Sequence, residues 1–149
     1  MTQTTRFKPP SLLFLLLVAM TVAHAMIPLA PLFSSPWNLI GCGLVAVGIA
    51  LNIIADQIFK GYGSVSACRG PDVLVTGGPY AISRNPMYLG FALILVGVGV
   101  ILGSLSTLVL AASFVPLTNR LYIRNEEAEL SRLEGDTWQA YAAKVRRWL

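Results

Sequence analysis

Two long stretches of the chain contain no charged side chain. The first covers residues 9–55 and the second covers residues 85–119. A helix needs only about 20 predominantly apolar residues to cross the hydrocarbon core of a bilayer, and a soluble domain of 149 residues could not bury two stretches of this length. The pattern therefore predicts an all-α integral membrane protein.

Helix-breaking residues divide the two stretches into four predicted transmembrane helices. Pro28 and Pro31 are expected to end or kink the first helix, and Gly103-Ser104 supplies a break inside the second stretch. Trp37 would anchor the second helix at the membrane interface. The predicted helices cover residues 12–32, 37–59, 86–102 and 105–123.

Composition and charge fix the expected orientation. Apolar residues make up 55% of the chain and charged residues 12%, about half the charged share of soluble proteins. With four helices all 11 Lys and Arg residues lie on one side, whereas three helices would leave six of them outside. The positive-inside rule thus predicts a multi-pass protein with both termini in the cytoplasm. The expected location is a bacterial inner membrane. Because the basic residues flank membrane spans, the net charge of +4 gives no reason to expect a nucleic-acid partner.

The first helix also resembles a secretory signal. Arg6 and Lys8 precede an apolar run that ends in Ala-His-Ala at residues 23–25, which imitates a cleavage site. Apolar residues continue to Phe33, so we expect the helix to be retained. His24 is expected to be a hydrogen-bonded residue between helices rather than a catalytic one, because it lies away from the cytoplasmic side. Cys42 and Cys68 are expected to be unlinked thiols, and no metal site is implied.

Candidate chemistry begins where the third predicted helix begins. Asn85 is a favourable N-cap and Pro86 a favourable first helical residue. The free backbone N–H groups of this helix start, with Arg84 beside them, suit a carboxylate or a phosphate. The alternative is an ordinary helix start with an arginine that reaches toward the membrane surface.

The C-terminal tail supplies the second set of candidate residues. The acidic pair Glu126-Glu127 follows the fourth predicted helix within a few residues, and Gly135 is expected to end the helix that carries it. Asp136 and Gln139 resemble a capping box for a further helix. That helix is expected to be amphipathic and to lie on the anionic leaflet. Its apolar stripe would be Trp138, Tyr141, Val145 and Trp148, beside Lys144, Arg146 and Arg147.

Two blocks together resemble the membrane-embedded methyltransferases, a family that includes isoprenylcysteine carboxyl methyltransferase and the phospholipid N-methyltransferases. The blocks are LVTGGPYAISRNPMYLG at residues 74–90 and NEEAELSRLEGDTWQAYAAKVRRWL at residues 125–149. The family pattern runs L-V-x-x-G-x-Y, R-(H/N)-P-x-Y-x-G, E-E-x-x-L and F-G-x-x-Y-x-x-Y, followed by a basic, apolar end. The length of the chain predicts a single domain over residues 1–149. The resemblance covers about residues 74–149 and implies that this half is catalytic.

The resemblance also implies S-adenosylmethionine as the cofactor. Tyr80 and Tyr88 would offer ring faces to its adenine or sulfonium, and Glu126 would accept from its ammonium or ribose hydroxyls. The implied cofactor-binding residues are Val73, Leu74, Val75, Tyr80, Asn85, Pro86, Met87, Tyr88 and Glu126.

Three positions depart from the family pattern. Asn85 stands where the carboxyl methyltransferases have histidine, Tyr122 stands where they have a substrate-contacting arginine, and Glu134 replaces an aromatic residue. The resemblance therefore describes the cofactor site better than the acceptor site. The candidate catalytic residues are Arg84, Arg124 and Glu127.

The expected reaction is direct in-line methyl transfer to a lipophilic small molecule, a lipid or a lipidated acceptor that enters from the membrane. A carboxylate or thiolate acceptor needs no protein base, whereas an amine needs one, and Glu127 is the candidate. Two alternatives stay open: an NADPH-dependent membrane sterol or steroid reductase, and a small transporter or structural protein. The Glu126-Glu127 pair disfavours the reductase, and the scarcity of acidic residues inside the predicted spans disfavours the transporter.

Overall fold

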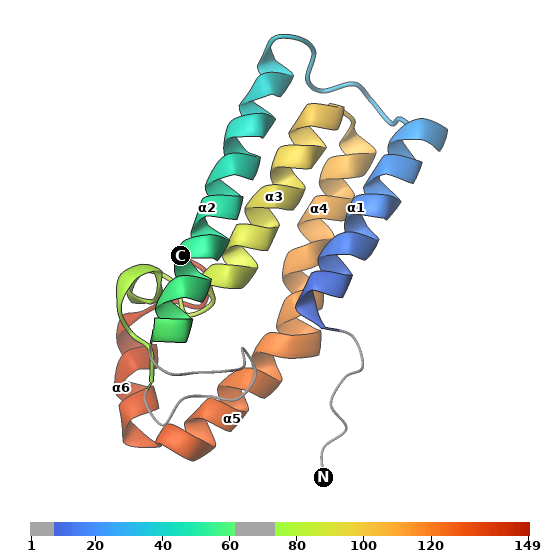
Figure 1. Ribbon diagram of the computed structural model, residues 1–149. Helices are drawn as coiled ribbons and strands as arrows, with labels where there is room; N and C mark the ends of the chain where they lie inside the picture. The colour runs from blue at the N-terminus through green and yellow to red at the C-terminus, as the bar shows by residue number, and fades with distance from the viewer. Residues whose placement is uncertain (1–7, 62–73) are drawn as a thin grey trace.

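The computed structural model describes residues 8–61 and 74–149, and the regular structure within these ranges is helical. Four longer helices stand side by side, and two shorter ones lie at one end of the bundle (Figure 1). The helices are α1 (Pro9–Met26), α2 (Ile40–Gly61), α3 (Pro86–Leu102), α4 (Leu105–Thr118), α5 (Arg124–Glu134) and α6 (Asp136–Lys144). Short 3₁₀ turns, η1 (Trp37–Leu39) and η2 (Gly78–Ala81), precede α2 and α3, and a π-helical segment, η3 (Asn119–Ile123), joins α4 to α5. The all-α prediction is confirmed for the described residues.

The bounds of α3 confirm the predicted helix over residues 86–102. Pro86 is its first residue, and Gly103 ends it in the left-handed conformation with φ of 72°. A β-carbon at Gly103 would lie 2.5 Å from the carbonyl oxygen of Phe33, so glycine is required there by both conformation and space.

The helix predicted over residues 12–32 is shorter than expected at its C-terminal end. α1 ends at Met26, and the segment that contains Pro28 and Pro31 is irregular, because proline cannot continue a helix. This segment is held by backbone hydrogen bonds to the α3–α4 turn, from Leu32 N to Gly103 O at 2.7 Å and from Leu105 N to Leu29 O at 2.9 Å.

His24 lies near the end of α1 and contacts the same turn. Its Nδ1 is 3.1 Å from Ser104 Oγ, in a network that also includes Thr107. The expectation of a hydrogen-bonded histidine between helices is confirmed.

The fourth predicted helix does not stop at residue 123. α4 contains Pro116, passes through η3 and continues into α5 without leaving helical backbone angles. The continuous orange ribbon in Figure 1 bends at this segment. Proline removes a backbone donor inside a helix, and a π-helical turn accommodates such an interruption.

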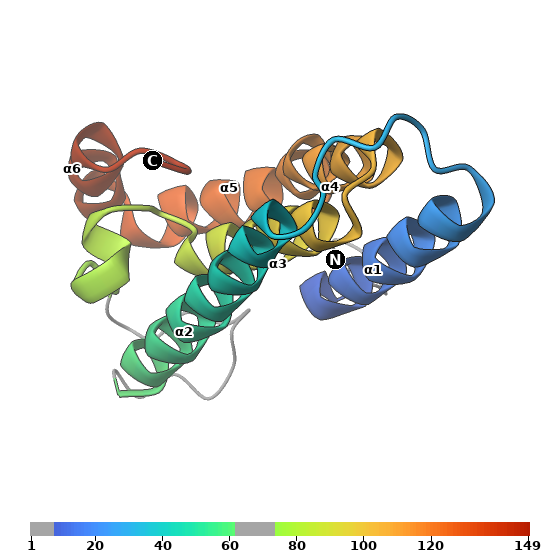
Figure 2. The same cartoon turned by 90° about the horizontal axis from the view of Figure 1, so that it is seen from above.

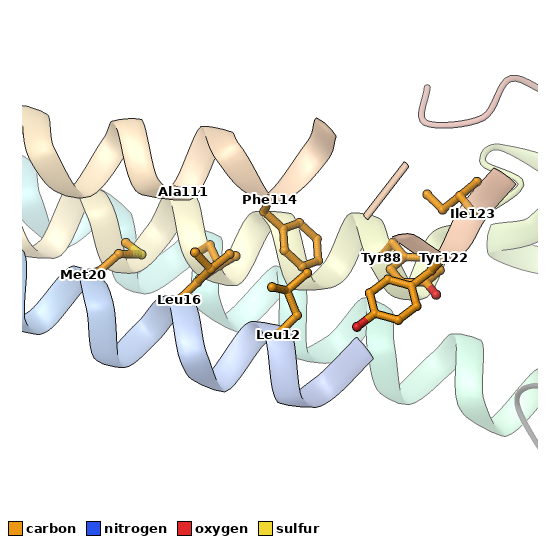
Figure 3. Close-up of a cluster of buried hydrophobic side chains, with 9 residues drawn as sticks. Leu12, Leu16, Met20, Tyr88, Ala111, Phe114, Tyr122 and Ile123 are labelled. Carbon is orange, nitrogen blue, oxygen red and sulfur yellow. The ribbon is translucent and has the colours of Figure 1, made fainter. Parts of the chain in front are cut away.

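α2 packs along α3, while α1 packs on α3 and α4. Seen from above, α1 and α2 flank α3 on opposite sides (Figure 2). A buried cluster fills the space between α1, α3, α4 and η3, as Figure 3 shows. Its buried members are Leu12, Leu16, Met20, Tyr88, Leu95, Ala111, Phe114, Tyr122 and Ile123.

Two helical segments are long and apolar enough to cross a membrane, Pro9–Met26 and Trp37–Gly61, and α3 is a shorter apolar helix. Their outward faces carry exposed apolar side chains, such as Phe14 with 69% of its surface exposed and Ile53 with 52%. Exposed apolar surface of this kind is expected where lipid is the solvent.

Candidate functional site

The candidate site is built around the start of α3. Asn85 occupies the N-cap position as predicted, but its side chain makes no capping hydrogen bond, so that part of the prediction is wrong. Instead, its Nδ2 donates to the carbonyl oxygen of Arg147 at 3.3 Å, and its backbone N–H donates to Ser83 Oγ at 3.1 Å. The N–H groups in the first turn of α3 are therefore left without a side-chain cap.

Tyr88 connects this helix start to the acidic pair of α5. Its hydroxyl donates to Glu126 Oε1 at 2.8 Å, although 38 residues separate the two in sequence. The ring of Tyr88 also stacks on that of Tyr122, with centroids 6.3 Å apart. Burial raises the pKa of Glu126, the neighbouring carboxylates of Glu127 and Glu129 raise it further, and the hydrogen bond from Tyr88 opposes the rise.

Glu127 lies between two arginines that come from different parts of the chain. Its Oε1 is 3.3 Å from Arg84 NH1 and accepts from Arg147 Nε at 3.0 Å, while its Oε2 pairs with Arg147 NH2. The guanidinium of Arg84 also faces the ring of Trp138, 5.6 Å from its centroid. Only 14% of the Glu127 side chain is exposed, so its carboxylate is largely shielded from water.

α6 covers the turn that precedes α3. The Tyr141 hydroxyl donates to the carbonyl oxygen of Tyr80 at 2.6 Å, and burial raises the pKa of each tyrosine to about 12. Trp138 and Tyr141 are only 7% and 8% exposed. The helix itself is confirmed, but the expectation that these two side chains face the membrane leaflet is wrong, because they pack against the protein.

The expected capping box at the start of α6 is absent. Gly135, with φ of 51°, occupies the N-cap position, and Gln139 donates its backbone N–H to the Gly135 carbonyl oxygen at 3.2 Å. Asp136 is the first residue of the helix, where a negative charge favours the positive end of the dipole.

The structure brings together most of the residues singled out in the sequence. Arg84, Asn85, Tyr88, Glu126 and Glu127 form one connected group, and Tyr80 joins it through α6. Among the other expected cofactor residues, Val75 and Pro86 are buried, and Leu74 and Met87 are half-buried.

One candidate is separate from this group, and another cannot be placed. Arg124 is exposed at the start of α5, and Val73 lies outside the described residues.

Four residues that were not predicted as site residues complete this group. Ser83 and Tyr141 hold the turn before α3, Trp138 faces Arg84, and Arg147 pairs with Glu127. The one signal for them was the acidic pair itself, because two partly buried carboxylates require donors. Nothing in the local pattern indicates which of the eleven basic residues would supply them.

The group contains donors and acceptors of the kind that a ligand with both a carboxylate and a cation needs. Arg84 Nε is buried and has no hydrogen-bond partner within the described part of the chain, and the uncapped start of α3 lies next to it. Glu126 offers a carboxylate, and the rings of Tyr88 and Tyr122 lie beside it. An amino acid group with a nearby sulfonium fits this set of donors, acceptors and ring faces.

Comparison with known proteins identifies a family. The family model described as phospholipid methyltransferase matches residues 37–135, which is more than half of the chain. The match includes α2 as well as the first of the two blocks, and it ends at Gly135, before α6. No curated protein and no solved structure matches the chain.

Proposed function

The chain belongs to the phospholipid methyltransferase family, and we propose that it transfers a methyl group from S-adenosylmethionine to a lipophilic or amphipathic acceptor at the cytoplasmic face of the membrane. The family implies methyltransferase activity on lipid-type substrates, and the apolar helices and the family together indicate a membrane protein. The cofactor, the membrane face and the course of the reaction are our proposal.

One observation carries the proposal. The hydrogen bond between Tyr88 and Glu126 joins the start of α3 to the start of α5. The two blocks that resemble the methyltransferases thus meet at one end of the bundle, next to Arg84, whose Nε lacks a partner in the described chain. Two separate motifs can contact the same ligand only if they lie next to each other, as these two do.

Each residue of this group has a proposed part in binding. Arg84 and the first turn of α3 would hold the carboxylate of S-adenosylmethionine, and Glu126 would accept from its ammonium or ribose hydroxyls. Tyr80 and Tyr88 would contact its adenine or sulfonium through their ring faces. The other proposed contacts are Val73, Leu74, Val75, Asn85, Pro86 and Met87.

When bound, S-adenosylmethionine supplies an electrophilic methyl group. The protein residues would bind both reactants, hold them in line and exclude water, and such positioning can lower the barrier by about 7–11 kcal/mol. Arg124, exposed at the start of α5, is proposed to contact the acceptor. Glu127 would serve as base only for an amine acceptor, and its pairing with two arginines supports a second part for it in orienting Arg84.

The proposed topology has four membrane spans in a single domain, residues 1–149, of a bacterial inner membrane. α1 and α2 are long enough to cross by themselves. α3 has 17 residues, at the lower end of the spanning range. α4 has 14, but it continues through η3 without a break, so the apolar helix available to the membrane is longer than α4.

Isothermal titration of the purified protein with S-adenosylmethionine, and separately with NADPH, tests the proposed cofactor. We expect binding of the first ligand alone. Glu126→Gln should weaken that binding roughly 10- to 150-fold, as expected for loss of a charge-assisted contact, while Glu134→Gln at the last residue of α5 should leave it unchanged. Binding of NADPH in place of S-adenosylmethionine would support a reductase instead.

Transfer itself is tested with S-adenosylmethionine labelled in its methyl group. The protein is incubated with a lipid extract, and label is expected in the organic phase. Label that stays entirely in the aqueous phase, under conditions where the cofactor binds, would count against a lipophilic acceptor.

A further inference from the structure

The last residues of the chain return to the start of α3. After α6 ends at Lys144, Val145 is extended. The carbonyl oxygen of Arg146 then accepts the backbone N–H of Arg84 at 3.0 Å. The carbonyl oxygen of Arg147 accepts from Ser83 Oγ at 3.2 Å and from Asn85 Nδ2 at 3.3 Å. Two consecutive carbonyl groups of the tail therefore fix three consecutive residues that precede α3.

The side chains of the tail connect this turn to the rest of the site. Arg147 pairs with both carboxylate oxygens of Glu127 on α5. Trp148 Nε1 donates to Asn119 Oδ1 at 3.3 Å, and its ring packs against the buried cluster. Backbone and side-chain contacts thus tie the tail to α3, η3 and α5 at once.

The contacts of Arg147 hold the proposed ligand-binding groups in place. Because Asn85 donates to the tail, its side chain does not cap α3. Because Arg147 occupies both oxygens of Glu127, the carboxylate is held in one orientation, and Arg84 NH1 lies 3.3 Å from it. A two-pronged guanidinium–carboxylate pair fixes orientation as well as charge.

A basic tail could also act only by attraction to anionic lipids. Under that explanation the neighbouring residues Arg146 and Arg147 would contribute equally, whereas in the structure their side chains have different contacts. The side chain of Arg146 is exposed, while that of Arg147 is engaged with Glu127. The difference between two adjacent residues of the same charge supplies a matched control.

We propose that residues 145–148 form a strap that shapes the cofactor site, with Arg147 as a positioning residue that holds Arg84 through Glu127 and Asn85 through its own carbonyl group. The inference rests on the proposed function, because it assigns Arg84 to the carboxylate of S-adenosylmethionine. It adds that the tail, which lies beyond the matched region 37–135, is needed for binding that cofactor.

The test compares Arg147→Gln with Arg146→Gln in the full-length protein. Each variant removes one positive charge from the tail and keeps the backbone carbonyl groups. Titration should show S-adenosylmethionine binding weakened roughly tenfold or more in Arg147→Gln, and within about twofold of wild type in Arg146→Gln. Equal losses in both variants would show that the tail acts through its charge, and no loss in Arg147→Gln would also overturn the proposal.

A second ligand separates positioning from general damage to the fold. Decarboxylated S-adenosylmethionine lacks the group that Arg84 is proposed to hold. Arg147→Gln should therefore lose much less affinity for it than for S-adenosylmethionine. The double variant Arg84→Ala/Arg147→Gln should bind S-adenosylmethionine only slightly more weakly than Arg84→Ala alone. Equal losses for the two ligands, or fully additive losses, would reject Arg147 as a positioning residue.

The remaining outcomes are also informative. If Arg147→Gln does not fold, Arg147→Lys carries the same comparison, because it keeps the charge but loses the two-pronged geometry. Folded wild-type protein that binds no S-adenosylmethionine would refute the proposed function before any variant is compared. Binding by wild type with an unaffected Arg147→Gln would instead refute only the strap.

Discussion

The guanidinium of Arg84 contacts two neighbours and still has N–H donors available. Glu127 lies 3.3 Å from NH1, the ring of Trp138 faces the group, and Nε has no partner among the described residues. A guanidinium has five N–H donors, so it can hold a ligand carboxylate without releasing Glu127. Only 16% of the side chain is exposed, whereas an arginine that merely anchors a span at the membrane surface would place its head group in water.

Arg84→Ala should therefore weaken binding of S-adenosylmethionine, by roughly 10- to 150-fold for a charge-assisted contact. The affinity for decarboxylated S-adenosylmethionine should fall much less, since that ligand lacks the carboxylate. Titration with both ligands checks this, and Arg132→Ala, a change at an exposed residue of α5, serves as control. Equal losses for the two ligands would place the carboxylate elsewhere.

Glu126 should make ligand binding and stability respond to pH in opposite directions. Burial raises its pKa above the ordinary value of 4.5, so the folded protein without ligand binds a proton more readily than the unfolded chain. The contribution of Glu126 to stability is then fully present below about pH 4.5 and is lost as pH rises through the raised pKa. A cationic ligand group prefers the charged carboxylate, so affinity should rise over the same interval.

Titration and thermal unfolding over a series of pH values that begins at the ordinary value of 4.5 and extends upward check this expectation. S-adenosylmethionine should bind wild type more tightly at the higher pH, and Glu126→Gln should show a flatter dependence in both measurements. A wild-type affinity that is independent of pH over this range would mean that Glu126 does not contact the cation.

At the scale of elements, glycines let α2 and α3 approach closely. Gly41 and Gly48 of α2 face Gly97 and Gly90 of α3, and a β-carbon at Gly48 would lie 2.7 Å from the Gly90 carbonyl oxygen. Small residues at such contacts allow the van der Waals packing that holds helices together in membranes. Gly43, on the same helix, has open space around it.

Gly48→Ala should consequently destabilise the protein, by about 1–3 kcal/mol for an overpacked contact. Gly43→Ala should be neutral or slightly stabilising, because alanine is the better helix former by up to about 1 kcal/mol. Unfolding of both variants in detergent gives the comparison. A Gly48→Ala protein as stable as Gly43→Ala would show that the two helices can separate without loss.

The elements that could be predicted are those marked by local signals. Asn85-Pro86 and Gly103 set the bounds of α3, and Gly135 separates α5 from α6, because proline and glycine act on the backbone at their own positions. The continuation of α4 into α5 has no such signal. Pro116 would predict an interruption of the helix, but the helix continues through the π-helical segment that follows it.

The contacts of the tail could not be predicted for a different reason. Arg147 meets Asn85 and Glu127 across separations of 62 and 20 residues. Hydrophobic periodicity shows which face of a helix is apolar, but not what covers it, so the stripe that contains Trp138 suggested lipid where the structure has protein. That the two blocks lie close together could be expected only from the family resemblance.

At the scale of the whole molecule, the two ends of the helical bundle differ in charge. The start of α1, the end of α2, the start of α3 and all of α5 and α6 lie at one end of the bundle (Figure 1). Every Lys and Arg of the described residues belongs to these parts of the chain or to the segments next to them. The opposite end, with the α1–α2 connection and the turn at Gly103-Ser104, has no Lys or Arg. A basic end and an uncharged end are what the positive-inside rule associates with the cytoplasmic and the outer side.

Both termini are therefore expected in the cytoplasm, and fusions to reporters can check this. Green fluorescent protein after Leu149 should fluoresce, while alkaline phosphatase, which is active only outside the inner membrane, should be inactive there. The same phosphatase fused after Gly103, at the uncharged end of the bundle, should be active. An odd number of spans would reverse the result at Leu149 and leave that at Gly103 unchanged, whereas an inverted bundle would reverse both.

The hydrogen bond between Arg84 N and Arg146 O adds a constraint, because the start of α3 and the tail must lie on the same side of the membrane. Phosphatase activity at Leu149 would thus contradict the topology and, with it, a cofactor site that opens to the cytoplasm.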